Sequence, residues 1–300
     1  MPIWGIDLGG TKIEGVALSD DKVPKILVRK RIDTEAAQGY QHIISRIRLL
    51  IDTMAHELGY FPEKIGLGTP GAIDPISGLM KNANTTILNG RYFKEDVKKA
   101  LGIPLKMAND ANCFALAEYK MGIVARESPQ ANVVFGVIMG TGVGGGIVVN
   151  GQLIHGRQGI GGEWGHNFLD VSGGPCYCGK TGCVETVISG KNLERYHHEK
   201  FYESKKLKDI YQGHLSGTSP NDTHTIKRLI TQFGRAIAGV INILDPDIIV
   251  IGGGVGNIDL LYNEGLKEVR KHVFNVKLDT IFHKPLLGDS AGVFGAAYLT

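Results

Sequence analysis

Two stretches of the chain share one design and decide the predicted fold: PIWGIDLGGTKIEGVAL at residues 2–18 and NVVFGVIMGTGVGGGIVVNGQL at residues 132–153. Each has the pattern of an apolar strand, a turn of glycine and threonine, and a second strand. The turns at residues 9–11 and 140–142 offer backbone N–H groups and a threonine hydroxyl to an anion. A unit that occurs twice predicts two related lobes that face each other and clamp a polyphosphate between their turns.

Charged side chains accompany the first turn, because Asp7 closes the strand before it and Lys12 follows it. An ordinary hairpin explains the turn but not the acid, hydroxyl and lysine gathered around it. The residues predicted to bind the nucleotide phosphates are Asp7, Gly9, Gly10, Thr11, Lys12, Gly140, Thr141 and Gly142.

The second turn also satisfies the dinucleotide fingerprint G-x-G-x-x-G through Gly140, Gly142 and Gly145. That fingerprint has force only where a helix follows the glycines. Here β-type residues follow at 147–149, and then the hairpin signal Asn150-Gly151. A dehydrogenase of the Rossmann type is therefore not favoured.

A third glycine run follows the buried-type strand at residues 247–251. Without side chains, this run would leave a flat backbone surface against which a planar base can lie. The residues expected to meet such a base are Gly252, Gly253, Gly254 and Gly256.

Asp110 lies in PLKMANDANCFALAEY (residues 104–119), where a strand runs into Asn109 and Asp110 and a helix leaves from them. This junction places Asp110 at the carboxyl edge of a sheet, where ligands bind in open α/β folds. A plain helix N-cap would need no function at all. Both interpretations stay open at this point.

The stretch GIGGEWGHNFLDVSGGPCYCGKTGCVE (residues 159–185) brings together His166, Cys176, Cys178 and Cys183. Three thiols and an imidazole form a closed tetrahedral zinc site, whereas a catalytic zinc keeps one position open. The predicted zinc is therefore structural, and a zinc hydrolase is not favoured. The alternative is that the thiols are buried as small hydrophobic groups. Glu163 and Glu185 flank the ligands, so the metal would fix two acceptors that can grip polyol hydroxyls.

The composition of the chain is ordinary for a soluble globular protein. It has 300 residues, 43% hydrophobic and 21% charged, which is enough for two lobes with separate cores. A formal charge of +3 gives no argument for nucleic acid. No apolar run reaches the roughly 20 residues of a membrane span, and no signal peptide is recognised. We therefore expect a cytoplasmic protein, in keeping with thiols that form a metal cluster rather than disulfides.

Helical periodicity predicts helices over residues 41–58, stopped by Gly59, and 93–101, capped by Gly102. A further helix is expected over residues 225–244, after a polar surface loop at 213–223. His197 and His198 are expected to be solvated. The run KNAN at 81–84 is equally compatible with a turn and with a ligand loop.

These motifs together resemble the ROK family of sugar kinases, within the actin-like ATPase superfamily. The resemblance covers nearly the whole chain through DLGGTK (7–12), NDAN (109–112), GTGVGGGIVVNG (140–151), GEWGH (162–166), CYCGKTGCVE (176–185) and DPDIIVIGGG (245–254). It implies a two-lobed actin-like (ribonuclease H-like) α/β fold with a ligand cleft between lobes. The implied lobes are residues 1–118 with 286–300, and residues 119–285 with the zinc loop 162–185.

The resemblance also implies a reaction, which is transfer of the γ-phosphoryl group of ATP to the 6-hydroxyl of a hexose. Asp110 would be the general base, with a low pKa lowered further by the helix N-terminus. Mg²⁺ would be held near Asp7 through water. The residues expected to bind the sugar are Gly71, Asn84, Asn109, Asp110, Glu163, His166 and Glu185. His166 would turn one ring nitrogen to the metal and its other face to the sugar.

Within the family, KNAN followed by TILNGR and the run PCYCGKTGCVET resemble bacterial fructokinases that also accept mannose, so fructose is the expected substrate. Glucose or N-acetylglucosamine is the alternative, because the acceptor positions are shared. A catalytically silent sugar sensor is another. A repressor is not favoured, because Asp7 leaves no room before it for a helix-turn-helix domain. A homodimer is expected from the family.

Overall fold

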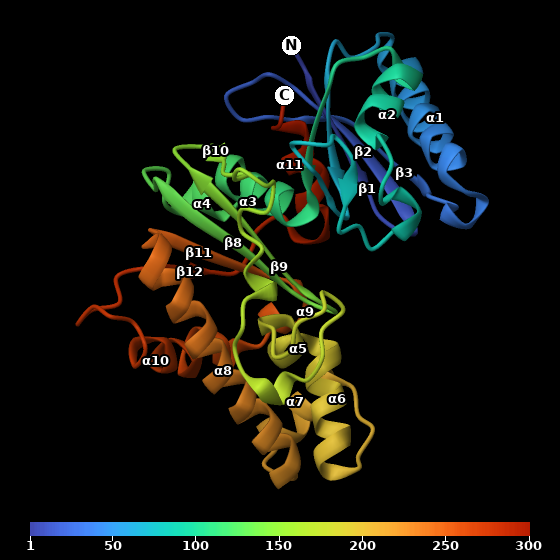
Figure 1. The fold of residues 1–300 in the computed structure, drawn as a ribbon. Coiled ribbons are helices and arrows are strands. Elements are labelled where there is room, and N and C mark those ends of the chain that lie inside the picture. Colours follow the sequence, from blue (N-terminus) through green and yellow to red (C-terminus); the bar gives the residue numbers. More distant parts are fainter. The chain divides into compact units, whose positions relative to one another are not determined.

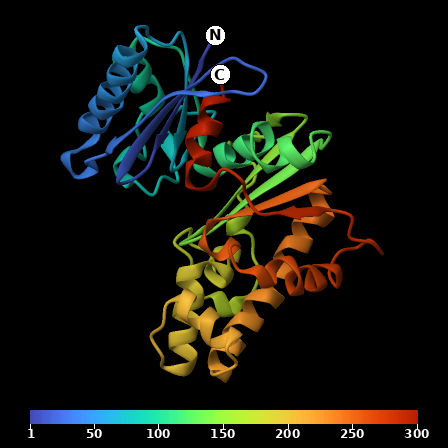
Figure 2. The same ribbon diagram turned by 180° about the vertical axis from the view of Figure 1, so that it is seen from behind.

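The computed structural model describes residues 1–300, which pack into two compact units (Figure 1). Unit 1 comprises residues 1–130, 146–161 and 286–300, and unit 2 comprises residues 131–145 and 162–285. The predicted lobe boundary at 118/119 differs from this division, because residues 119–130 and 146–161 pack with unit 1. The chain thus passes between the units four times, and Figure 2 shows the same path from behind.

Unit 1 is built on a five-stranded sheet with the order β3-β2-β1-β4-β7. Its strands are β1 (Ile3–Leu8), β2 (Lys12–Leu18), β3 (Ile26–Asp33), β4 (Ile65–Thr69) and β7 (Leu105–Asn109). The pairs β1–β2 and β2–β3 are antiparallel, whereas β1–β4 and β4–β7 are parallel. A small antiparallel pair, β5 (Ala72–Ile73) with β6 (Met80–Lys81), stands apart from this sheet.

The helices of unit 1 are α1 (Tyr40–Leu58), α2 (Phe93–Leu101), α3 (Asp110–Lys120), α4 (Ile123–Glu127) and α11 (Ala291–Ala297). Short 3₁₀ turns occur at η1 (Ala36–Gln38), η2 (Thr86–Leu88) and η6 (Gly288–Ser290). The predicted helices at 41–58 and 93–101 are confirmed. Each ends at a glycine in the left-handed region, Gly59 (φ 79°) and Gly102 (φ 68°), where a side chain would be strained.

Glycines in the sheet of unit 1 let α11 approach closely. A Cβ on Gly5 of β1 would lie 2.3 Å from the Val293 carbonyl oxygen, and one on Gly66 of β4 would lie 1.7 Å from that of Ala296. The other face of the sheet packs on α1 through buried residues such as Trp4, Ile6 and Ile47. Both faces are therefore covered, which is why β1 is almost continuously apolar.

Unit 2 contains most of a second sheet, with the order β10-β9-β8-β11-β12. Its strands are β8 (Val133–Met139), β9 (Val143–Val149), β10 (Gln152–Leu153), β11 (Ile248–Gly252) and β12 (Ile281–His283). Strand β9 begins in unit 2 and ends in unit 1, where β10 pairs with it. The pairs β8–β11 and β11–β12 are parallel.

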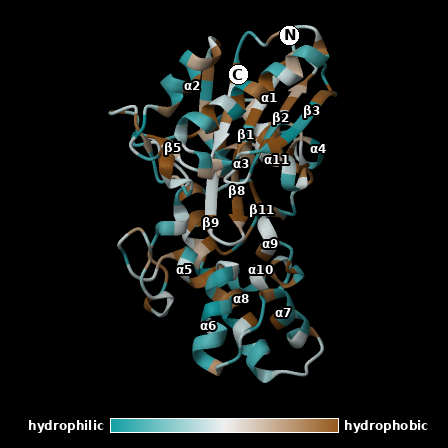
Figure 3. Ribbon diagram, turned by 90° about the vertical axis from the view of Figure 1, so that its right-hand side faces the viewer, coloured by the Kyte–Doolittle hydropathy of each residue, from teal (hydrophilic) through white to brown (hydrophobic).

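The helices of unit 2 are α5 (Val184–Ile188), α6 (Gly190–Phe201), α7 (Leu207–Leu215), α8 (Pro220–Leu244), α9 (Gly253–Gly256) and α10 (Glu264–Arg270). Short 3₁₀ turns occur at η3 (Trp164–His166), η4 (Val171–Gly173) and η5 (Asp259–Tyr262). In Figure 3, β8 and β11 are coloured largely as hydrophobic and α6 largely as hydrophilic, as expected for inner strands and an outer helix. None of the helices combines the length and apolar character needed to cross a bilayer.

Three local predictions in unit 2 are wrong. The segment 213–223 is not a surface loop, because α7 extends to Leu215 and α8 begins at Pro220, after an N-cap in which Ser219 accepts the Asp222 N–H. The glycine run does not form a flat surface but turns into the short helix α9. His197 is fully buried rather than solvated.

Candidate functional site

The first glycine turn joins β1 to β2 and is held from behind. The Gly9 N–H donates to the Lys12 carbonyl (2.9 Å), and Thr34 ties the turn down by donating its N–H to Thr11 O and its hydroxyl to Gly9 O (2.8 Å each). Gly10, Thr11 and Lys12 are exposed on the other side. The turn therefore has a fixed shape and an accessible front, as an anion-binding turn requires.

Asp7, the penultimate residue of β1, lies beside two glycines that make room for its carboxylate. A Cβ on Gly292 would lie 2.8 Å from Oδ2 of Asp7, and one on Gly68 would lie 3.1 Å from Oδ1. Burial, followed by the negative charges of Asp110 and Glu14, raises the pKa of Asp7 to about 7. A nearby cation would favour the ionised form of a carboxylate in these surroundings.

Asp110 is the first residue of α3, at the end of β7. The N-cap is the preceding residue, Asn109, whose side-chain oxygen accepts the Asn112 N–H at 2.8 Å. The plain N-cap interpretation of Asp110 is therefore wrong. The Asp110 side chain is accessible and accepts the Ala111 N–H through Oδ1 (2.8 Å).

The pKa of Asp110 is raised, not lowered as its helix position predicts. Surrounding protein atoms limit its hydration, and this effect exceeds the opposite effect of the backbone N–H groups. Burial, followed by the negative charges of Asp7 and Asp110, raises the pKa of Cys113 well above its usual range, so this thiol stays protonated.

The remaining predicted sugar-binding residues of unit 1 are Gly71 and Asn84. Gly71 packs against β6 and the residues after it, since a Cβ there would lie 2.6 Å from the Lys81 carbonyl oxygen. Asn82 adopts the left-handed region (φ 58°), and Asn84 is exposed. The KNAN run therefore contains a turn, and it also presents Asn84 to solvent.

The second glycine turn joins β8 to β9 in unit 2. The Gly140 N–H donates to Gly142 O (2.9 Å), and the Gly140 carbonyl accepts the Gly190 N–H at the start of α6 (2.8 Å). A cavity of about 800 Å³ opens beside this turn. It is lined by Gly140, Thr141, Gly190, Lys191, Glu194, Lys206, Leu207, Lys208, Tyr211, Gly254, Val255, Asn257 and Ile258. This volume is within the range of small-molecule and cofactor sites, roughly 300–1,000 Å³.

The cavity brings together some of the predicted nucleotide residues and omits others. Gly140, Thr141 and Gly254 line it, whereas Gly252, Gly253 and Gly256 do not. Gly253 instead lies close to β8, where a Cβ would be 2.4 Å from the Met139 carbonyl oxygen. The walls supplied by α6 and α7 were not predicted.

The cysteine loop gathers the four predicted ligands. One ligand atom from each of His166, Cys176, Cys178 and Cys183 lies within 4.8 Å of the others, with the Cys176 Sγ to His166 Nδ1 and Cys178 Sγ to Cys183 Sγ distances both 3.6 Å. Of the thiols, Cys178 has a lowered pKa, whereas burial raises the pKa of Cys183 to about 12. The donor set and its convergence fit a tetrahedral zinc ion.

The free ring nitrogen of His166, Nε2, lies 2.9 Å from the Tyr177 hydroxyl, and the two rings meet edge to face. A hydrogen bond at this position fixes the ring so that Nδ1 faces the thiols. Tyr177 was not predicted as part of this site.

Glu163 and Glu185 lie at the two ends of the loop, near the second glycine turn. Glu185 Oε2 accepts the N–H of Val143 at 3.0 Å, directly after Gly142. Next to Glu163, Trp164 donates its ring N–H to the Gly144 carbonyl at 3.0 Å. The loop that carries these carboxylates is thus anchored on the strand that follows the second glycine turn.

A family model described as the ROK family matches residues 3–300. The chain belongs to the ROK family. The N-acetyl-D-glucosamine kinase of Aliivibrio fischeri is 33% identical to it over 306 aligned positions, covering 99% of this chain and 98% of that protein.

Solved structures of the ROK family agree with the fold. The ROK hexokinase of Thermus thermophilus superposes with a TM-score of 0.88 at 27% identity, over 100% of this chain and 98% of that one. The ROK glucokinase of Streptomyces griseus, solved with glucose and AMPPNP, gives 0.77 at 25% identity, over 100% and 99%. These matches confirm the predicted family and the α/β, actin-like fold class.

Proposed function

We propose that this ROK protein is an ATP-dependent sugar kinase that transfers the γ-phosphoryl group to the 6-hydroxyl of a hexose. The observation that carries the proposal is Asp110. Its carboxylate is accessible, it is not needed as the N-cap of α3, and its raised pKa makes it a stronger base than an ordinary aspartate. The cavity beside Gly140 and Thr141 supports a nucleotide site in unit 2.

In this proposal Asp110 orients the sugar hydroxyl and accepts its proton. A carboxylate suffices because the transition state of phosphoryl transfer is loose, so the oxygen need not lose its proton early. The N–H groups of the two glycine turns stabilise the charge on the transferred group. Mg²⁺, held through water near Asp7, would neutralise phosphate charge, and it would favour the ionised form of Asp7.

The sugar hydroxyls are assigned to Asn84, Asn109, Glu163, His166 and Glu185, with the Gly71 backbone beside them. The contact of His166 Nε2 with the Tyr177 hydroxyl means that the sugar would share this nitrogen with Tyr177 or displace it. A site of paired donors and acceptors rejects sugars that lack a matching hydroxyl, since an unpaired buried polar group costs ~1–3 kcal/mol.

N-acetylglucosamine is the proposed substrate. The Aliivibrio fischeri relative that aligns with nearly the whole chain is named N-acetyl-D-glucosamine kinase. None of the comparisons above supports the fructose expectation. A structural zinc ion bound by His166, Cys176, Cys178 and Cys183 is part of the proposal, since it would hold Glu163 and Glu185 in place.

A coupled assay of ADP release tests this function with N-acetylglucosamine, fructose, mannose and glucose as acceptors. We expect the highest kcat/KM with N-acetylglucosamine. Asp110→Asn should lower kcat by about 10³-fold while binding of the sugar, measured by calorimetry, persists. No ADP release with any sugar would indicate a silent sensor, and a highest kcat/KM with fructose would restore the first expectation.

A further inference from the structure

The wall of the cavity formed by α7 depends on contacts outside the helix itself. Helix α7 has nine residues, and its N-cap, Lys206, makes no side-chain capping hydrogen bond. Isolated helices of this length are marginal in water, so tertiary contacts must fix this one. Leu207, Lys208 and Tyr211 nevertheless line the cavity from it.

Glu194 of α6 holds the start of α7 from the cavity side. Its Oε1 accepts the Leu207 N–H, and its Oε2 pairs with the Lys206 ammonium, both at 3.0 Å. This carboxylate satisfies one of the free N–H groups of the first helical turn, in the manner of a cap supplied by another element.

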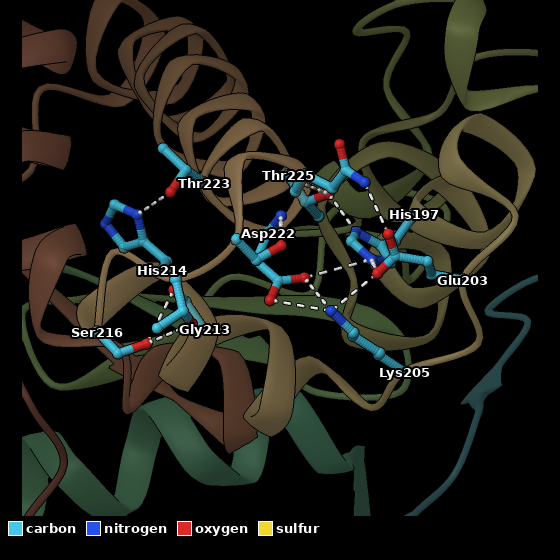
Figure 4. Close-up of polar contacts among 12 residues, drawn as sticks. His197, Glu203, Lys205, Gly213, His214, Ser216, Asp222, Thr223 and Thr225 are labelled. Atoms are coloured by element: carbon cyan, nitrogen blue, oxygen red, sulfur yellow. Dashed lines mark hydrogen bonds and ion pairs between the residues drawn. The ribbon is translucent and has the colours of Figure 1, made fainter.

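Asp222 of α8 contacts Lys205 before α7 and lies close to Gly213 within it (Figure 4). It is 2% exposed, and its two carboxylate oxygens lie 3.0 and 3.2 Å from the Lys205 ammonium, just before the start of α7. A Cβ on Gly213, near the other end of α7, would lie 1.9 Å from Oδ2 of Asp222. One buried carboxylate therefore lies close to the chain near both ends of the helix, at Lys205 just before it and at Gly213 in its last turn.

His197 and Glu203 complete the surroundings of Asp222. The Thr225 hydroxyl donates to the Asn221 carbonyl (3.2 Å), so His197 Nδ1, at 2.8 Å from that hydroxyl, is placed to donate to it. His197 Nε2 is buried, lacks a hydrogen-bond partner and lies 3.3 Å from Oδ1 of Asp222. Glu203 lies 2.8 Å from the Lys205 ammonium.

Three of these side chains are metal-binding types, and their ligand atoms lie within 4.8 Å of one another. The Lys205 ammonium, however, already contacts both carboxylates, as Figure 4 shows. Hydrogen bonds from Lys205 and then Asn221 lower the pKa of Glu203 to about 2, and Glu203 and Asp222 raise that of Lys205. The observations favour lysine over a metal as the cation of this cluster.

We propose that Asp222, through Lys205 and Gly213, is a positioning residue that sets the place of α7 and thereby the affinity of the cavity for the nucleotide. This inference rests on the proposed function, because it takes the cavity to be the ATP site. The residues of this cluster are neither the proposed catalytic residue nor the residues proposed to bind the sugar. Disturbing it should raise KM for ATP and leave KM for the sugar and kcat unchanged.

Gly213→Ala is the sharpest test. Alanine is the better helix former, so helix propensity does not work against the substitution, and only the contact with Asp222 is disturbed. We expect KM for ATP to rise about tenfold, which corresponds to a loss of about 1.4 kcal/mol in binding free energy. Gly239→Ala in α8 is the matched control, because no atom lies within 4 Å of its added Cβ.

Lys205→Met provides a second variant in case Gly213→Ala fails to fold. It should raise KM for ATP similarly, whereas Lys205→Arg should restore most of the affinity. Lys267→Met, which removes a 2.6 Å ion pair with Glu264 on exposed α10, is its control. ADP binding by calorimetry should follow KM for ATP in each variant.

The outcomes separate this inference from the proposed function. If the unaltered protein neither binds ADP nor phosphorylates a sugar, the proposed function fails. If it does both, and KM for ATP is unchanged in Gly213→Ala and Lys205→Met, the positioning role fails. If KM for ATP and KM for the sugar rise equally and kcat falls by a similar factor, the cluster contributes only to the general stability of the protein and has no specific positioning role. A second equivalent of zinc or manganese, beyond that of the cysteine loop, would overturn the assignment of Lys205 as its cation.

Discussion

At the scale of single residues, Asp7 and Asp110 of the candidate site have different surroundings. Asp7 is enclosed by Gly68 and Gly292 and meets the negative charges of Asp110 and Glu14, so its pKa rises to about 7. Asp110 stands at an accessible helix start, and its pKa is also raised. Because the charge of Asp110 is one cause of the shift at Asp7, a cation that pairs with either acid should ionise both more readily.

The shift at Asp7 predicts a pH-dependent cost to the fold. Its folded pKa is raised above 3.8, so the folded state binds more protons than the unfolded state between about pH 4 and 7, and stability falls as pH rises through that window. Asp7→Asn removes the cost. We expect the variant to exceed the unaltered protein in free energy of unfolding by more at pH 8 than at pH 5, with an increase between the two pH values of the order of 2 kcal/mol.

Urea unfolding in metal-free buffer at the two pH values measures this difference. Asp20→Asn serves as the comparison, because Asp20 is an exposed carboxylate with a lowered pKa. A gain for Asp7→Asn that is the same at pH 5 and pH 8 would contradict the assignment of the shift to ionisation of Asp7.

At the scale of elements, regular patterns were predictable and tertiary contacts were not. The helix at 41–58 follows from its apolar spacing and from Gly59, which can adopt the left-handed conformation that ends it. The sequence does indicate the start of α8, because Ser219 is a favourable N-cap and Pro220 follows it at the first helical position. This signal was missed because the polar residues around it suggested a loop.

The candidate site divides in the same way. Sequence motifs located the two glycine turns, Asp110 and the cysteine loop, because their chemistry depends on neighbours close in the chain. The cavity walls at Lys191 and Tyr211 come from helices whose position depends on packing. His197 was mistaken for a solvated residue because its partners Asp222 and Thr225 lie more than 20 positions away.

The cysteine loop makes its own prediction. Cys178→Ser removes one of four converging ligands, so bound zinc should fall from about one equivalent to well below it, and KM for the sugar should rise about tenfold because Glu163 and Glu185 lose their support. Mass spectrometry of the metal content and the kinase assay measure the two effects.

Cys113→Ala is the control for this experiment, since Cys113 lies outside the ligand cluster and should leave the zinc content unchanged. Absence of zinc from the unaltered protein, purified without chelator, would contradict the metal assignment.

Close packing between elements predicts where a single methyl group is not tolerated. Gly66→Ala would place a Cβ 1.7 Å from the Ala296 carbonyl oxygen, a backbone atom that cannot rotate away. We expect a loss of at least ~3 kcal/mol in free energy of unfolding, at the upper end for overpacking. Gly239→Ala is again the control, and it should raise the free energy of unfolding by ~0.5–1 kcal/mol. Gly90→Ala is not suitable, because Gly90 has a φ of 74°, which strains an alanine. Equal unfolding midpoints for the two variants would show that α11 can shift at no cost.

At the scale of the whole molecule, unit 1 is assembled from three separate stretches of chain. The last of them, residues 286–300, is tied to the rest of the unit at several points. Glu118 of α3 accepts the N–H groups of Leu286 and Leu287 (3.1 and 2.9 Å). Gly295 of α11 lies so close to α3 that a Cβ would be 1.8 Å from the Cys113 carbonyl oxygen. The sheet of unit 1 thus gains one of its two covering layers from the far end of the chain.

This arrangement predicts that residues 1–130 alone do not fold cooperatively. Without α11, the face of β1 and β4 at Gly5 and Gly66 is left bare, and the Glu118 carboxylate loses the N–H groups of Leu286 and Leu287. We expect weak, broad thermal unfolding by circular dichroism.

Joining residues 286–300 to Gln130 through a flexible linker should sharpen the transition and raise its midpoint, because α11 can then pack again against β1, β4 and α3. A fused fragment carrying Gly66→Ala should lose that gain, since the contact of Gly66 with Ala296 is then blocked. If residues 1–130 unfold cooperatively at the midpoint of the fused fragment, the covering helix contributes nothing and this account of the unit is wrong.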